Sequence, residues 1–154
     1  MHGRPLAILP ESNGRPQGSR SEEARVQALD IFRHDDAHTR SFDAGETIFS
    51  IDDAADCMYV IISGAVEIFI DGAVLERVEP GGLVGEMALI EQLPRSASAV
   101  AVEPTKVSTV DRKRFLFLVQ HHPFFALTVM DVLAQRLRRM DATLRKASPQ
   151  AASR

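Results

Sequence analysis

Apolar and polar residues alternate over several short segments between residues 46 and 110, which is typical of β-strands. In residues 65–70 the aliphatic side chains stand at every second position, so they would face one side of a strand. Asp71-Gly72 follows directly and predicts a tight hairpin turn into a second strand over 73–78. Many short strands separated by turn residues predict a barrel or a double-sheet jelly roll. Further strands are expected over 98–102 and 106–110.

The N-terminal part of the sequence carries a helical pattern instead. Val26, Leu29 and Phe32 are spaced to share one face of a helix over residues 20–32. No comparable periodicity precedes this helix.

Residues 1–19 are rich in Gly, Pro, Ser, Asn and Arg, and they are expected to be a disordered tail. Residues 147–154 are expected to be a second disordered tail. The length of 154 residues suits one domain, which we place at residues 20–146.

Two helices are expected after the strands. Asp111 can cap the first, and Pro123 ends it because the residue before a proline disfavours the helical region. The second helix is expected over about residues 124–146. Its apolar side chains recur at steps of four and three, which suits a coiled-coil dimer but equally suits a helix that packs on its own domain. This stripe consists of Ala126, Met130, Leu133, Leu137, Met140 and Leu144.

Composition narrows the classes of function. The formal net charge of −3 argues against nucleic acid as the main partner. No apolar run is long enough to predict a transmembrane helix, so no membrane partner is expected. The only cysteine, Cys57, excludes an intrachain disulfide and is expected to be a buried thiol in a cytoplasmic protein. His34 and His38 lack the glutamate of a zinc-enzyme motif, so no metal or other cofactor is expected.

The segment 83–98 carries the candidate chemistry. Gly85 permits a tight turn and close approach to a ligand, and the helical turn after it begins with free backbone N–H groups. Arg95 adds a planar set of donors suited to phosphate oxygens. Glu86 would repel a phosphate, so its natural target is a neutral hydroxyl. The alternative interpretation is a structural ion pair between Glu86 and Arg95.

This segment resembles the phosphate-binding cassette of cyclic nucleotide-binding domains. The resemblance extends from about Phe42 to about Met140 and rests on several segments in a fixed order. In the cassette these are Leu83-Val84-Gly85-Glu86-Met87-Ala88-Leu89 and Pro94-Arg95-Ser96-Ala97-Ser98. Before it they are Phe42-Asp43-Ala44-Gly45-Glu46-Thr47-Ile48-Phe49 and Met58-Tyr59-Val60-Ile61-Ile62-Ser63-Gly64-Ala65-Val66. The family fold is α+β and mainly β. The resemblance therefore implies a double-stranded, jelly-roll-like β-roll with a helical N-terminal segment, a short helix in the cassette and two C-terminal helices.

The resemblance also implies roles for individual residues. Gly85 and Glu86 would meet the ribose, and Val84 would touch the sugar or the base. The cyclic phosphate would be held by the backbone of Met87 and Ala88, the side chain of Arg95, and Ser96, with Ala97 allowing close approach. Arg136, Arg139 and Met140 lie where the family's final helix covers the base, although the arginines could equally form a solvated basic face.

The sequence thus predicts a regulatory module that binds a cyclic nucleotide, has no catalytic function and moves its C-terminal helix on binding. Cyclic AMP is favoured over cyclic GMP because Ser96 stands where a threonine often accompanies guanine recognition in the family. The signal would pass to an effector protein whose identity the sequence does not give. Three alternatives stay open: a truncated transcription factor of the catabolite-activator type without its DNA-binding part, a cupin-like enzyme, and a degenerate β-roll that docks proteins without nucleotide. The cupin alternative lacks histidines between Phe42 and Val119.

Overall fold

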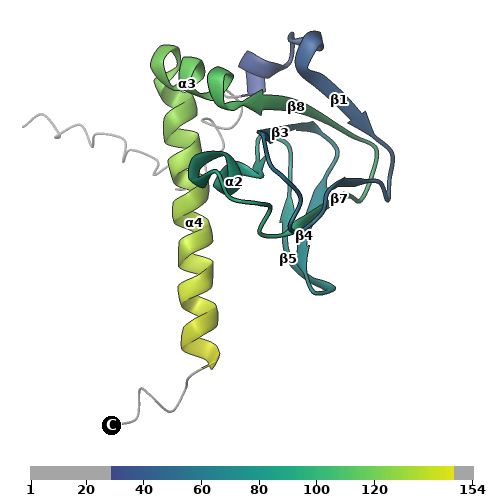
Figure 1. Cartoon of the computed structure of the whole chain (residues 1–154), viewed down its shortest axis with the longest axis vertical. Coiled ribbons are helices and arrows are strands. Elements are labelled where there is room, and N and C mark those ends of the chain that lie inside the picture. The colour runs from purple at the N-terminus through teal and green to yellow at the C-terminus, as the bar shows by residue number, and fades with distance from the viewer. Residues whose placement is uncertain (1–28, 148–154) are drawn as a thin grey trace, which may run out of the picture.

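Two four-stranded antiparallel sheets form the body of the molecule in a computed structural model, which describes residues 29–147. One sheet has the order β1-β8-β3-β6 and the other the order β2-β7-β4-β5 (Figure 1). This is the predicted β-roll. The strands are β1 (Thr39–Phe42), β2 (Thr47–Phe49), β3 (Cys57–Ser63), β4 (Val66–Ile70), β5 (Ala73–Val78), β6 (Leu83–Val84), β7 (Ser98–Ala101) and β8 (Thr105–Asp111).

The local turn signals are confirmed. Asp71 and Gly72 both have positive φ angles, 51° and 78°, and they join β4 to β5 with Ile70 opposite Ala73. The alternation expected in β4 is weaker than its sequence indicates, because the pairing with β5 shifts between Ile68 and Phe69. As a result Val66 is the fully buried residue of this strand.

Strand β3 places its side chains in two separate cores, because successive residues of a strand point to opposite faces. Met58 and Val60 face the helices and join a cluster that includes Phe125. Tyr59 and Ile61 face the space between the two sheets. The β1-β8-β3-β6 sheet is therefore covered on both sides.

Three α-helices lie together on one side of the roll: α2 (Glu86–Glu91), α3 (Arg112–His121) and α4 (Pro123–Ala147). The short 3-10 helix η1 (Asp36–His38) directly precedes β1. Figure 1 shows α4 running along the roll with α2 next to it, and the C-terminal end of α4 extending beyond the strands. The predicted cap is present: Asp111 Oδ1 accepts a hydrogen bond from the Arg114 backbone N–H at 2.7 Å.

The helical structure is interrupted next to Pro123, as the sequence predicts. α3 ends at His121 and α4 begins at Pro123, with a bend of 114° between the two helices. Among the described residues no single helix is long and apolar enough to cross a membrane, and α3 and α4 reach that length and composition only as this bent pair.

The structure describes the predicted N-terminal elements only in part. Residues 29–32 are helical, and Leu29 and Phe32 are buried, as their spacing predicts. Val26, the rest of the predicted helix, the predicted tail over 1–19 and residues 148–154 of the second tail lie outside the described residues.

Candidate functional site

The turn at Gly85 brings the cassette together. Gly85 precedes α2 with a φ of 79°, a left-handed conformation that L side chains rarely adopt. A Cβ at this position would overlap Arg95 Nη1 and would lie 3.4 Å from Phe49 Cε1. Glycine is therefore required here both for backbone conformation and for space.

Arg95 is buried, with 4% of its surface exposed, although it follows an exposed loop. Its guanidinium lies over the Phe49 ring, 4.2 Å from the centroid. Arg95 Nη1 donates to the Gly85 carbonyl at 3.1 Å, and Nη2 donates to the Cys57 carbonyl at 2.6 Å. The Nε atom is buried without a hydrogen-bond partner. Arg95 thus keeps donor capacity inside the site.

The surroundings of Arg95 are apolar and aromatic. Tyr59 stacks on Phe49 with 5.9 Å between ring centroids, and Arg95 lies 5.7 Å from the Tyr59 ring. Burial raises the pKa of the Tyr59 hydroxyl to about 12, so this ring stays neutral near pH 7. Cys57, expected to be a buried thiol, is only half-buried because it begins β3 at the end of the sheet. Its carbonyl, rather than its thiol, takes part in the site.

Glu86 does not pair with Arg95 among the ion pairs of the described residues, which removes the structural ion pair considered from sequence. It is 1% exposed, and its Oε1 atom pairs with Arg136 Nη1 from α4. Its Oε2 atom is buried without a partner. The carboxylate therefore has one oxygen bound and one available.

Arg136 connects α4 to the cassette by three contacts. Besides Glu86, it donates through Nη2 to the Leu83 carbonyl at 2.6 Å and through Nε to Glu76 Oε2 at 2.9 Å. Burial alone would lower the pKa of Arg136, but the Glu86 and Glu76 carboxylates outweigh it and raise this pKa above its usual value. Arg136 is thus charged and ordered, and the solvated basic face considered from sequence is wrong for this residue.

The other predicted site residues lie around this centre. Val84 is fully buried in the core between the sheets, and Ala88 is also buried. Met87 and Ser96 are exposed, and Ala97 is half-buried. From α4, Arg139 pairs with Glu76 at 3.1 Å, whereas Met140 is 62% exposed.

A family model described as "Cyclic nucleotide-binding domain" matches residues 39–122, which include every residue of the cassette. The chain belongs to the cyclic nucleotide-binding domain family. This confirms the resemblance seen in the sequence, and the two packed sheets with their helices are the fold of that family.

Known proteins similar to this cyclic nucleotide-binding domain include regulators of two kinds. The cyclic AMP receptor protein of Thermus thermophilus is 37% identical over 110 residues, 68% of this chain and 51% of that protein. The cAMP-dependent protein kinase regulatory subunit of Yarrowia lipolytica is 40% identical over 98 residues, 64% of this chain and 25% of that protein. The chain thus spans about half the length of the first relative and a quarter of the second.

The similarity to a solved structure covers the C-terminal helices as well as the sheets. The crystal structure of Thermus thermophilus catabolite activator protein matches with a TM-score of 0.66 and 32% identity. The match covers 93% of this chain and 62% of that one.

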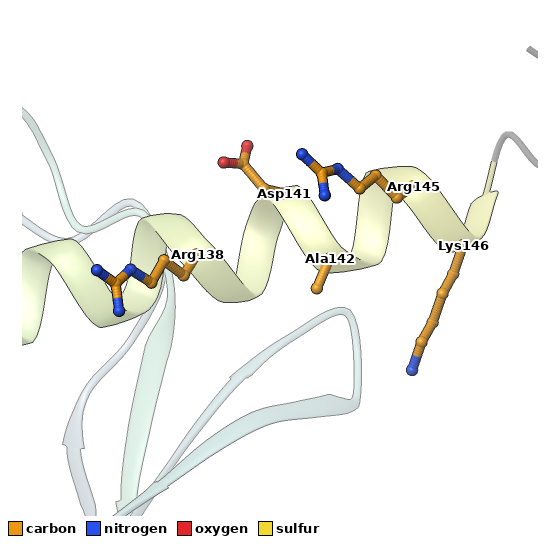
Figure 2. Close-up of a pocket in the computed structure, with 5 residues that line it drawn as sticks. All are labelled: Arg138, Asp141, Ala142, Arg145 and Lys146. Carbon is orange, nitrogen blue, oxygen red and sulfur yellow. The ribbon is translucent and has the colours of Figure 1, made fainter. Parts of the chain in front are cut away.

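One hollow among the described residues lies away from the cassette. Its volume is about 440 Å³, and it is lined by Arg138, Asp141, Ala142, Arg145 and Lys146, all on α4. Figure 2 shows that Asp141 and Arg145 extend to one side of the helix and Lys146 to the other, so these side chains do not converge on a common point. A second cavity of about 80 Å³ lies between β5 and α4 and is lined by Glu76, Leu83 and Arg136 among others.

Sequence reasoning missed four contributors to the site: Phe49, Tyr59, the Cys57 carbonyl and Glu76. Phe49 and Tyr59 lie in segments that resemble the family, but that resemblance gave them no role at the site. Nothing local marked Glu76 or the Cys57 carbonyl. From the sequence, His34 and His38 were not expected to bind a metal. In the structure, His38 Nδ1 lies 3.0 Å from Oδ1 of the Asp35 carboxylate. Within residues 29–147, no three His, Cys, Asp or Glu side chains gather where they could hold a metal ion.

Proposed function

We propose that this domain binds cyclic AMP, in preference to cyclic GMP, as a regulatory ligand and that the domain itself is not catalytic. One observation carries the proposal. Among the described residues, the buried side-chain polar atoms without a partner are Glu86 Oε2 and Arg95 Nε. A buried polar atom left unpaired costs about 1–3 kcal/mol, so an acceptor and a donor unpaired in one site favour a ligand that supplies both partners.

A cyclic nucleotide carries the matching groups. A ribose hydroxyl can donate to Glu86 Oε2, while an anionic phosphate suits Arg95 and is repelled by Glu86. Charge-assisted bonds from Arg95 to phosphate are stronger than its present bonds to the neutral carbonyls of Gly85 and Cys57. The backbone N–H groups of Met87 and Ala88 in the first turn of α2 and the exposed Ser96 hydroxyl supply further donors in the cassette.

Two further features support cyclic AMP over cyclic GMP. The names of the Thermus and Yarrowia relatives both refer to cyclic AMP. Ser96 lacks the methyl group by which a threonine restricts its rotamer, so its hydroxyl is less fixed for reading a guanine amino group.

Calorimetric titration tests the ligand directly. The chain should bind cyclic AMP at one site per chain, bind cyclic GMP more weakly, and bind linear 5′-AMP least. Tighter binding of cyclic GMP would reverse the order proposed for the base. Absence of heat and of competition with either cyclic nucleotide would refute the proposed function and favour the docking module.

Glu86→Ala tests the ribose contact. Binding of cyclic AMP should weaken by about 10- to 100-fold, as expected for a hydrogen bond to a charged group. Binding of 2′-deoxy cyclic AMP should weaken much less, because the contact is already missing there. An equal loss for both ligands would make Glu86 structural.

The signal would leave the domain through α4. We propose that a change at Glu86 is passed to Arg136 and thus to the helix, and from there to an effector protein or a further domain in the cytoplasm. The apolar residues exposed on α4 also support a homodimer through this helix. A population shift of α4 can be only as large as the difference in ligand affinity between its two positions.

A further inference from the structure

The second half of α4 is held to the roll by charges. In its first half Phe125, Val129 and Val132 are buried in the core. After Leu133, which packs partly on that core, no described residue of α4 is buried. The polar contacts of this half with the roll include those made by Arg136 and Arg139.

Glu76 lies at the centre of these contacts. It is on β5, opposite Ile68, and only 17% of its side chain is exposed. Its Oε2 atom accepts from Arg136 Nε at 2.9 Å, and its Oε1 atom lies 3.1 Å from Arg139 Nη1. One carboxylate therefore holds both arginines that the sequence placed near the base.

Glu76 fixes the direction of the Arg136 guanidinium. This planar group has three contact directions in use: Nε toward Glu76, Nη2 toward the Leu83 carbonyl and Nη1 toward Glu86. A guanidinium cannot turn one nitrogen without moving the others. Its hold on Glu76 therefore determines how Nη1 meets Glu86.

The contact between Arg136 Nη1 and Glu86 decides which carboxylate oxygen of Glu86 is available to a ligand. Arg136 takes Glu86 Oε1 and leaves Oε2 buried and unpaired. Glu86 is also almost fully buried, and Arg136 is the positive group that faces it from α4.

We propose that Glu76 is a positioning residue for the ligand site. It acts through Arg136 to present Glu86 Oε2 to a ribose hydroxyl. This inference rests on the proposed function, since it concerns how the same site recognises the sugar. Glu76 itself contacts the two arginines and is not assigned a contact with the ligand.

Glu76→Gln tests the proposal because it keeps the size of the side chain and removes its charge. Glu79→Gln is the matched control: Glu79 lies three residues further, is exposed, and pairs with Arg77 rather than with α4. Each variant is titrated with cyclic AMP and with 2′-deoxy cyclic AMP, at low and at moderate salt. Glu76→Asp, which keeps the charge on a shorter side chain, provides a second test if Glu76→Gln does not fold.

Glu76→Gln should weaken cyclic AMP binding by about 3- to 10-fold, because the lost charge-assisted contact affects the ligand only indirectly, through Arg136. It should weaken 2′-deoxy cyclic AMP binding by less than 2-fold, and Glu79→Gln should change neither. Glu76→Asp should fall between wild type and Glu76→Gln. An equal loss for both ligands would show a merely structural role, and no loss relative to Glu79→Gln would also overturn the proposal.

The proposed function and the role of Glu76 can be disproved separately. If the wild-type chain binds no cyclic nucleotide, the proposed function is wrong. If the wild-type chain binds and Arg95→Ala abolishes binding while Glu76→Gln behaves like Glu79→Gln, only the role of Glu76 is wrong.

Discussion

Arg95 shows how the protein can pre-organise a single side chain in a binding site in the absence of its ligand. A flat guanidinium can lie on the Phe49 ring while its edge donates to the Gly85 and Cys57 carbonyls. A lysine has a point charge and no such edge, so it could not make the same set of contacts. Arg95 is therefore ordered by the protein and still has a free donor at Nε.

Replacing Arg95 by alanine removes the only charge assigned to the phosphate. We expect cyclic AMP binding to weaken by about 2–5 kcal/mol, the range for truncating one partner of a buried charge pair. The measurement is a calorimetric titration. Arg77→Ala is the control, because Arg77 is half-exposed and pairs only with surface glutamates in the ion pairs described here. Unchanged binding in Arg95→Ala would mean that the phosphate lies elsewhere.

Gly85→Ala should harm both stability and binding. The φ of 79° strains any L side chain, and the new Cβ would overlap Arg95 Nη1. We expect a loss of about 1–3 kcal/mol in the free energy of unfolding, with binding weakened because Arg95 must move. Gly45→Ala is a matched control: its φ is 88°, but a Cβ there meets no atom within 4 Å. Equal effects of the two changes on binding would show that only backbone strain matters.

At the scale of elements, α4 carries two apolar stripes rather than one. Its inner stripe, formed by Phe125, Val129 and Val132, packs on the roll. The stripe singled out from sequence is split: Leu133 packs partly on the core, whereas Met130, Leu137, Met140 and Leu144 are about 60% exposed. The interpretation that the whole stripe packs on its own domain is therefore wrong. Residues 130, 137 and 144 keep a seven-residue spacing, as a coiled-coil helix pair requires.

Leu137→Glu should weaken self-association through α4. A charge at the centre of an apolar seam has no partner when the helices pair, so the dimer should shift toward monomer by at least tenfold in dissociation constant. Sedimentation equilibrium measures this shift. Arg138→Glu is the control, since the neighbouring residue is exposed and lies off the seam. A wild-type chain that is monomeric at high concentration would refute the dimer.

At the scale of the whole molecule, the cassette lies where the roll, α2 and α4 meet. Glu86 comes from α2, Leu83 from β6, Glu76 from β5 and Arg136 from α4. A ligand at this junction contacts several elements at once and should stabilise them together. Its effect should therefore appear in global unfolding rather than in one helix.

Ligand should raise the stability of the folded chain by mass action. At a cyclic AMP concentration 100 times the dissociation constant, the free energy of unfolding should rise by about 2.7 kcal/mol. Chemical denaturation with and without ligand measures this. Arg95→Ala at the same ligand concentration should show almost no rise, and a rise equal to that of wild type would mean binding outside the cassette.

The sequence by itself determined the local features, because their causes act over a few residues. The Asp71-Gly72 turn, the Asp111 cap, the break at Pro123 and the left-handed turn at Gly85 each follow from the conformational preferences of the residues involved. β1 escaped prediction because its residues do not alternate in polarity. It is a strand because Thr39–Phe42 pair with β8, which lies more than sixty residues further along the chain.

Only the tertiary structure decided which side chains contact each other across long distances in the sequence. Arg136 meets Glu86 across 50 residues and Glu76 across 60, and Arg95 meets the Cys57 carbonyl across 38. No local sequence pattern encodes these pairs. A charged side chain pairs with whichever opposite charge is nearest, and that distance is known only after packing of the apolar core has positioned each element. The same holds for α4: periodicity showed that the helix is amphipathic, but its face toward the roll was fixed by the space that Phe125, Val129 and Val132 fill.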